Sequence, residues 1–126
     1  MRVLVTLFLV LAGCATMKQP ADTLSVYEVA KRHAELDGKI IRVRGVVKYC
    51  QHLSCVLYST DNRDHFLSLG TSPSFDDAID LHLGHEVVVE ATLNDDCVQD
   101  FDTGVIVMCS DRSDTLHNAR IVWPRQ

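Results

Sequence analysis

The chain has 126 residues, of which 47% are hydrophobic and 23% charged, and its formal net charge is −5 at pH 7. This length suits one domain with a hydrophobic core and is too short for two. Because sequence-independent affinity for nucleic acid comes from neutralising phosphates, the acidic balance argues against a general nucleic-acid binder. We therefore expect no nucleic-acid partner.

The N-terminus combines one positive charge, Arg2, with an apolar run over residues 3–11. A run of about nine residues is too short to span a bilayer as a helix, which takes about twenty. These two features are typical of a secretory signal peptide. The run ends in Leu11-Ala12-Gly13-Cys14, which is a leucine and two small residues before a cysteine.

This tetrapeptide resembles the lipobox of bacterial lipoproteins. The resemblance implies that residues 1–13 are removed and that Cys14 carries acyl chains of the palmitate type, which anchor the protein in a membrane. It also implies the outer membrane, on the periplasmic side, because Ala15 stands where Asp would favour retention in the inner membrane. The alternatives are an ordinary signal peptide with a chance cysteine and a cytosolic protein with an apolar start.

Cleavage at this site would leave 113 of the 126 residues, with a net charge of −6 because Arg2 is lost. Residues 14–23 contain Pro20 and show no periodicity, so we interpret them as a lipidated tether. Residues 24–126 then form the folded domain.

A helix followed by a strand is expected at the start of this domain. Ser25 and Glu28 have the spacing of a capping box, which predicts a short helix over 26–35 that stops before Gly38. In the segment 39–49, apolar and basic residues alternate, as in a half-buried strand, and Gly45 marks a place where the strand could bend. The residues expected to face the core are Ile41, Val43, Val47 and Tyr49.

Further strands are expected at 55–58, 65–69, 86–93 and 119–123, with another apolar segment at 105–108. Ser72-Pro73 predicts the start of a second helix, and Gly84 its end. A helix between the third and fourth strands is the layout of the five-stranded OB barrel. Residues 37–45 and 84–91 also resemble the first and fourth strands of OB-like domains in small bacterial lipoproteins. The expected fold is therefore mainly β, a small OB-like barrel with two short helices, with an open β-sandwich or roll as the alternative.

Four cysteines remain besides Cys14, and an even number in an exported domain favours two disulfides. We expect the pairs Cys50–Cys55 and Cys97–Cys109, because each closes one local loop. The alternative is that Cys50, His52 and Cys55 belong to a zinc site completed by a further ligand, which would make the chain a metal-binding lipoprotein. The acidic residues around Cys97 do not have EF-hand spacing, and we interpret them as a solvated loop.

Arg42, Arg44 and Lys48 form a basic stripe that could contact an anion. The simpler interpretation is that they pair across strands with Glu86 and Glu90. Aromatic side chains that could stack on bases are few, namely Tyr49, Tyr58 and Phe66, and Tyr49 is expected in the core.

No hydrolase, metalloprotease or phosphate-binding motif occurs in the sequence. We therefore expect no catalytic residue, no metal and no cofactor. The function that these patterns favour is a non-enzymatic, lipid-anchored binding or accessory domain of the cell envelope. Its ligand, and any envelope protein that it contacts, are not identified by the sequence.

Overall fold

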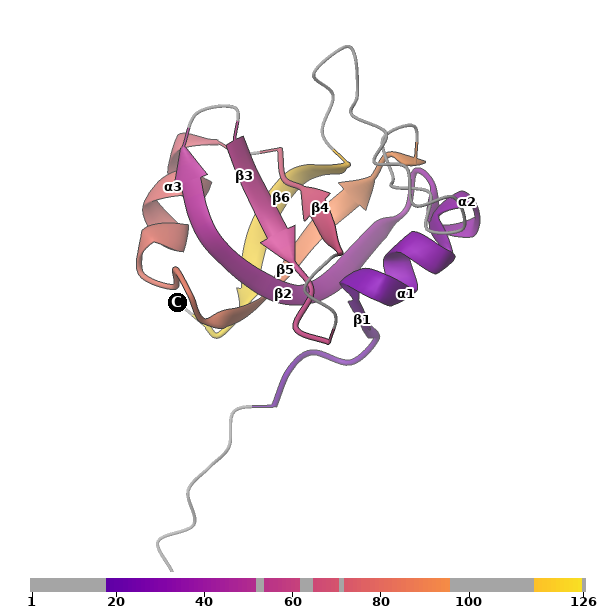
Figure 1. Ribbon diagram of the computed structural model, residues 1–126, viewed down its shortest axis with the longest axis horizontal. Helices are drawn as coiled ribbons and strands as arrows, with labels where there is room; N and C mark the ends of the chain where they lie inside the picture. The colour runs from indigo at the N-terminus through magenta and orange to yellow at the C-terminus, as the bar shows by residue number, and fades with distance from the viewer. Residues whose placement is uncertain (1–17, 52–53, 62–64, 71, 96–114, 126) are drawn as a thin grey trace, which may run out of the picture.

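The computed structural model describes residues 18–51, 54–61, 65–70, 72–95 and 115–125. Over this part of the chain the fold is mainly β, as expected, with six strands and three short helices (Figure 1). The strands are β1 (Thr23–Ser25), β2 (Ile40–Gln51), β3 (Ser54–Tyr58), β4 (Phe66–Ser68), β5 (Glu86–Leu93) and β6 (Leu116–Trp123). The helices are α1 (Val26–Lys31), α2 (His33–Leu36) and α3 (Pro73–Asp80). The sequence predicted five strands and two helices, which is one strand and one helix fewer than the described residues form.

The strands form one sheet in the order β4-β3-β2-β5-β6, and every pair in this order is antiparallel. The short β1 pairs in parallel with β2. The long β2 curves through the centre of the sheet, which brings β4 and β6 near each other (Figure 1). There, an isolated parallel bridge joins Leu69 to Leu116, and the Gly70 N–H donates to the Leu116 carbonyl at 2.7 Å. The Ala119 N–H also donates to the Gly70 carbonyl at 3.4 Å, but β4 and β6 form no regular ladder among the described residues, so the sheet is a coiled and open one.

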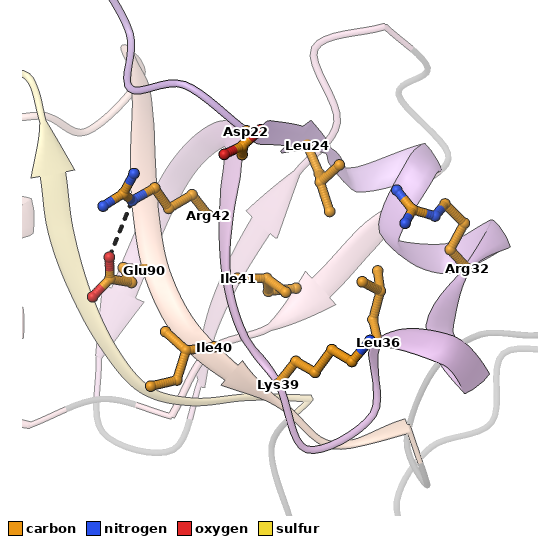
Figure 2. A pocket seen from close by; sticks show the side chains of 9 residues that line it. All are labelled: Asp22, Leu24, Arg32, Leu36, Lys39, Ile40, Ile41, Arg42 and Glu90. Carbon is orange, nitrogen blue, oxygen red and sulfur yellow. Dashed lines mark hydrogen bonds and ion pairs between the residues drawn. The ribbon is translucent and has the colours of Figure 1, made fainter.

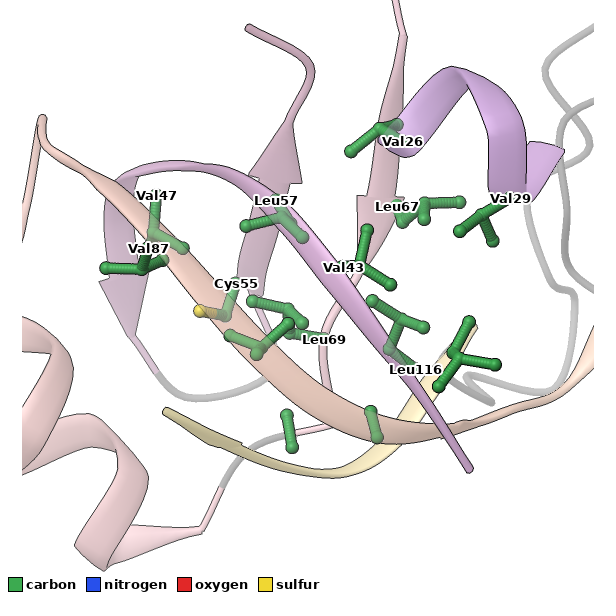
Figure 3. Close-up of a cluster of buried hydrophobic side chains, with 14 of the residues drawn as sticks. Val26, Val29, Val43, Val47, Cys55, Leu57, Leu67, Leu69, Val87 and Leu116 are labelled. Atoms are coloured by element: carbon green, nitrogen blue, oxygen red, sulfur yellow. The ribbon is translucent and has the colours of Figure 1, made fainter. Parts of the chain in front are cut away.

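The core lies inside this curved sheet and is covered at one end by α1 (Figure 3). The alternation that predicts a half-buried strand holds for the first part of β2, where Val43 and Val47 are fully buried. Leu57, Leu67 and Leu116 contribute from β3, β4 and β6, and Val26 and Val29 from α1. Burial of these side chains, at roughly 1.5–3 kcal/mol each, is the main favourable contribution to folding.

A bulge near the end of β2 reverses the alternation. Val47 pairs with Leu57, but the next pair joins Cys50 to Cys55, so β2 holds one residue more than β3. Lys48 and Tyr49 are therefore both exposed, and Cys50 turns inward. Tyr49 is 57% exposed, so the prediction that it faces the core is wrong.

Gly45 lies in the middle of β2, where β3 approaches closely. A Cβ atom at this position would be 2.6 Å from Leu57 Cγ and 2.6 Å from the Tyr58 carbonyl oxygen. Any larger residue would therefore push the two strands apart, which explains a glycine inside a strand.

The capping box at the start of α1 is confirmed. The Glu28 N–H donates to Ser25 Oγ at 3.1 Å, and the Ser25 N–H donates to Glu28 Oε2 at 2.7 Å. The helix predicted as one piece over 26–35 is interrupted at Arg32, whose φ of −110° and ψ of 17° are not helical, and continues as α2. Gly38 follows with a φ of +73°, a conformation that glycine adopts without strain.

The tether expected over 14–23 is partly taken into the fold. Thr23 belongs to β1 and lies opposite Arg42, and the Gln19 side chain donates to Glu86. Sequence patterns missed β1 because three residues are too short to show a period.

The second predicted helix is α3. Ser72 Oγ accepts a hydrogen bond from the Phe75 N–H at 3.3 Å, with Pro73 directly after the cap. The helix ends at Asp80, and Gly84 in the following turn donates its N–H to the Val47 carbonyl at 2.9 Å. None of the helices in the described residues is long and apolar enough to cross a membrane.

Candidate functional site: an aromatic and basic face and a groove

The cysteines of the predicted zinc alternative are joined to each other. Cys50 and Cys55 form a disulfide across the β2–β3 ladder, which confirms the predicted pair. Their Cα atoms are 4.3 Å apart. Zinc binds thiolate sulfur, so neither cysteine is available as a ligand in this state. The described residues contain no cluster of three or more side chains suited to a metal. His52 lies outside them, as do Cys14, Cys97 and Cys109, whose roles stay predictions.

The predicted pairing between the first and fourth expected strands is confirmed for Arg42. Arg42 lies opposite Glu90 in the β2–β5 ladder, and its Nε donates to Glu90 Oε2 at 3.1 Å. Arg120 of β6 donates to the other oxygen of Glu90 at 2.6 Å, a contact that the sequence did not suggest. Hydrogen bonds from Arg120 and Arg42 lower the pKa of Glu90 below its usual value.

The other two residues of the basic stripe do not pair with glutamate. Arg44 Nη1 donates to the Thr23 carbonyl at 3.4 Å and Nη2 lies 4.0 Å from Asp61. Lys48 places its Nζ 4.7 Å from the centre of the Tyr58 ring. The expected partner Glu86 instead lies opposite Val46. The three residues of the basic stripe therefore have different partners: Arg42 pairs with a carboxylate, Arg44 with a carbonyl and Asp61, and Lys48 with a ring.

Lys48 belongs to an aromatic and basic cluster on the outer face of β2, β3 and β4. Tyr58 and Phe66 are directly opposite each other in the β3–β4 ladder, with ring centroids 6.1 Å apart and planes at 50°. Their neighbours Leu57 and Leu67 point into the core, so the two rings point outward and are half-buried. We call Lys48, Tyr58 and Phe66 the aromatic–basic face.

A second ring pair lies where α1 meets the start of β4. The rings of Tyr27 and His65 stack with centroids 5.4 Å apart and planes at 19°, and Lys31 Nζ lies 5.3 Å from the Tyr27 centroid. The spacing of Tyr27 and Lys31, four residues apart on a predicted helix, could have indicated their contact. The stacking with His65 depends on the tertiary fold.

A groove of about 560 Å³ lies beside β1 (Figure 2). Apolar side chains from β1, α2 and the start of β2 lie along it, and charged side chains surround them. The residues that line it are Asp22, Leu24, Arg32, Leu36, Lys39, Ile40, Ile41, Arg42 and Glu90. Its volume is within the usual range of small-molecule sites, about 300–1,000 Å³.

No protein-family model matches this sequence, and no curated protein matches it. Among solved structures, the chain is similar to a protein from Klebsiella pneumoniae that is provisionally described as a nucleic acid-binding lipoprotein. The TM-score is 0.54 and the sequence identity 18%, over 82% of this chain and 99% of that one. At this identity the similarity shows a shared fold.

The sequence-based exclusion of nucleic acid must be corrected, because it conflicts with the description of a protein of the same fold. The exclusion relied on net charge and on a shortage of exposed rings. Net charge is a sum over the whole chain, whereas a ligand responds to the local arrangement of charges. The structure places Lys48 against Tyr58, beside Phe66, on one outward face, which composition does not reveal.

Proposed function

We propose that this chain is a non-enzymatic, lipid-anchored binding protein of the bacterial cell envelope. In this proposal Cys14 carries the lipid and holds an OB-like domain on the outer membrane, facing the periplasm. The lipobox-like residues 11–14 support the anchor, and the strand order with α3 between β4 and β5 supports the OB-like assignment.

We infer that the ligand binds on the aromatic–basic face. The observation that carries this inference is the contact of Lys48 with Tyr58 beside Phe66, on the outward side of β2, β3 and β4. Such a face suits a ligand that combines flat rings with negative charge. Single-stranded nucleic acid has both properties, because its bases stack on aromatic side chains and its phosphates attract cations. It is also the ligand class in the description of the structurally similar Klebsiella protein.

Fluorescence anisotropy with a labelled single-stranded oligonucleotide tests this ligand class. Loss of one stacked ring weakens binding by about 1–3 kcal/mol, so Tyr58→Leu should raise Kd at least about fivefold. Tyr58→Phe keeps the ring and should bind nearly as well as the wild type. Lys48→Gln should weaken binding and reduce its salt dependence, unlike Arg125→Gln, which removes an exposed cation near the C-terminus.

Two results would contradict the nucleic-acid proposal. One is an absence of binding by the wild type even at low salt. The other is equal affinity of Tyr58→Leu and Tyr58→Phe, which would show that the ring at this position does not contact the ligand.

A further inference from the structure

The groove of Figure 2 lies where the chain enters the fold. Asp22 lines it directly before β1, and Leu24 of β1 forms part of its apolar wall. If Cys14 is lipidated, as proposed above, seven residues, 15–21, lie between the lipidated cysteine and Asp22. The eight Cα–Cα steps from residue 14 to residue 22 span at most about 28 Å when the chain is extended. The anchor therefore keeps the groove within reach of the membrane surface.

The groove combines a buried apolar wall with an exposed apolar rim. Leu36 and Ile41 are only 6% and 7% exposed, and Leu24 is partly buried against the core. Ile40, directly beside them, is 72% exposed. A large aliphatic side chain this exposed, next to a groove with apolar walls, suits contact with an acyl chain.

Cations outnumber carboxylates around these apolar residues. Arg32 Nε forms an ion pair with Glu35 Oε1 at 2.6 Å. Arg42 and Arg120 both form ion pairs with Glu90, so a single carboxylate is the partner of two guanidinium groups. Lys39 has no ion-pair partner among the residues that the structure describes, and its ammonium group lines the groove (Figure 2). Asp22 is the remaining carboxylate, which leaves a positive excess of one at the groove.

We propose that this groove seats an anionic phospholipid of the membrane that holds the chain. The acyl chain lies along Leu24, Leu36 and Ile41, with Ile40 at the membrane interface. The phosphate lies near Lys39, between Arg32 and Arg42. A second contact of this kind fixes the orientation of the domain on the bilayer, which a single lipidated cysteine alone does not do.

Tryptophan quenching in the full lipidated chain tests this proposal, with Ile40→Trp as the probe. The protein is reconstituted in vesicles of phosphatidylcholine, with or without phosphatidylglycerol, and the acyl chains are brominated to quench nearby tryptophan. The wild type, whose single tryptophan is Trp123, gives the background. The expected result is that Trp emission from position 40 shifts to shorter wavelength and is quenched more strongly when phosphatidylglycerol is present.

Charge variants of the Ile40→Trp protein test whether lipid binding in the groove causes the quenching. Adding Lys39→Gln should raise the phosphatidylglycerol fraction needed for half-maximal quenching by about fivefold, the effect of one cation at an anionic surface. Adding Arg125→Gln, which removes the same charge outside the groove, should change it little. Equal effects of the two substitutions would overturn the groove assignment, as would equal quenching in vesicles with and without phosphatidylglycerol.

Two further measurements separate the sources of failure. If inorganic phosphate at millimolar concentration reverses the quenching, the groove binds a free anion and the lipid assignment is wrong. The mass of the purified chain reports whether Cys14 is acylated. An unacylated chain contradicts the proposed anchor, whereas an acylated chain without quenching contradicts only the docking.

Discussion

At the scale of single residues, Glu90 is a largely buried carboxylate held by two arginines. Only 17% of its side chain is exposed, and each of its two oxygens accepts from a different arginine. The hydrogen bonds from Arg120 and Arg42 favour the ionised carboxylate and hold the pKa of Glu90 below its usual value. Since Arg42 and Arg120 come from different strands, this one carboxylate connects β2, β5 and β6 on the outer face.

The stability of the fold should depend on pH through Glu90. A carboxylate whose pKa is lowered in the folded state contributes stability that is fully present above its unfolded pKa, and this contribution is lost as pH falls through the folded pKa. We expect Glu90→Gln to lower the free energy of unfolding by about 1 kcal/mol at pH 7, a modest value because both arginines are partly exposed. Near pH 3 the variant and the wild type should differ less.

Urea denaturation at the two pH values measures this difference. Glu35→Gln is the matched control, because Glu35 pairs with Arg32 on the open surface and should change stability little at either pH. An equal loss for Glu90→Gln at pH 7 and pH 3 would show that the ionised carboxylate is not the cause.

At the scale of the elements, the β2–β3 hairpin is shaped by one bulge and one disulfide. The bulge moves Cys50 to the inward side, where it lies opposite Cys55, and turns Tyr49 outward. The covalent bond thus holds the bulged end of β2 against β3. Cys50 is 9% and Cys55 4% exposed, so the bond also forms part of the core.

The double substitution Cys50→Ala with Cys55→Ala should lower the free energy of unfolding by about 2 kcal/mol, the value of the chain-entropy model for so short a loop. Urea denaturation of envelope-purified protein without reductant measures it. Reductant should bring the wild type close to the double variant measured in the same reductant, because neither protein then has the Cys50–Cys55 bond. If reductant leaves the wild type unchanged, the Cys50–Cys55 bond is absent from the native protein.

The same samples test the predicted pair Cys97–Cys109. Reductant should destabilise the Cys50→Ala, Cys55→Ala variant further if the second bond exists. Peptide mapping without reduction then identifies which cysteines are joined.

At the scale of the whole molecule, the proposed function depends on where in the cell envelope the domain is anchored. In the proposed function, the lipid on Cys14 holds the domain on a membrane. The tether is partly fixed by β1 and by the contact of Gln19 with Glu86, so the domain can lie close to its anchor.

Cys14→Ser should block maturation, because serine has no sulfur to form the thioether with the lipid. We expect an unprocessed or mislocalised precursor, detected by its mass and by fractionation of cells. Ala15→Asp should keep lipidation and shift the mature protein toward the inner membrane. Processing of Cys14→Ser identical to that of the wild type, with both proteins soluble, would contradict the proposed anchor.

The sequence by itself determined the features that depend on neighbouring residues. The capping box at Ser25, the start of α3 at Ser72 and the alternation through Val43 in β2 are local patterns, and the structure confirms each. The Cys50–Cys55 pair was also predictable, because the two residues flank one short loop. Such features need only a few consecutive residues, whose spacing fixes which side chains can meet.

Only the tertiary structure decided the features that join distant segments. The bulge that exposes Tyr49, the parallel pairing of β1, and the sharing of Glu90 by Arg42 and Arg120 all depend on which strands become neighbours. The same is true of the aromatic–basic face and of the groove, whose residues come from several elements. A one-residue shift in register moves every later side chain to the opposite face of a strand. For this reason a local pattern predicts that a strand exists but does not determine which of its side chains form a site.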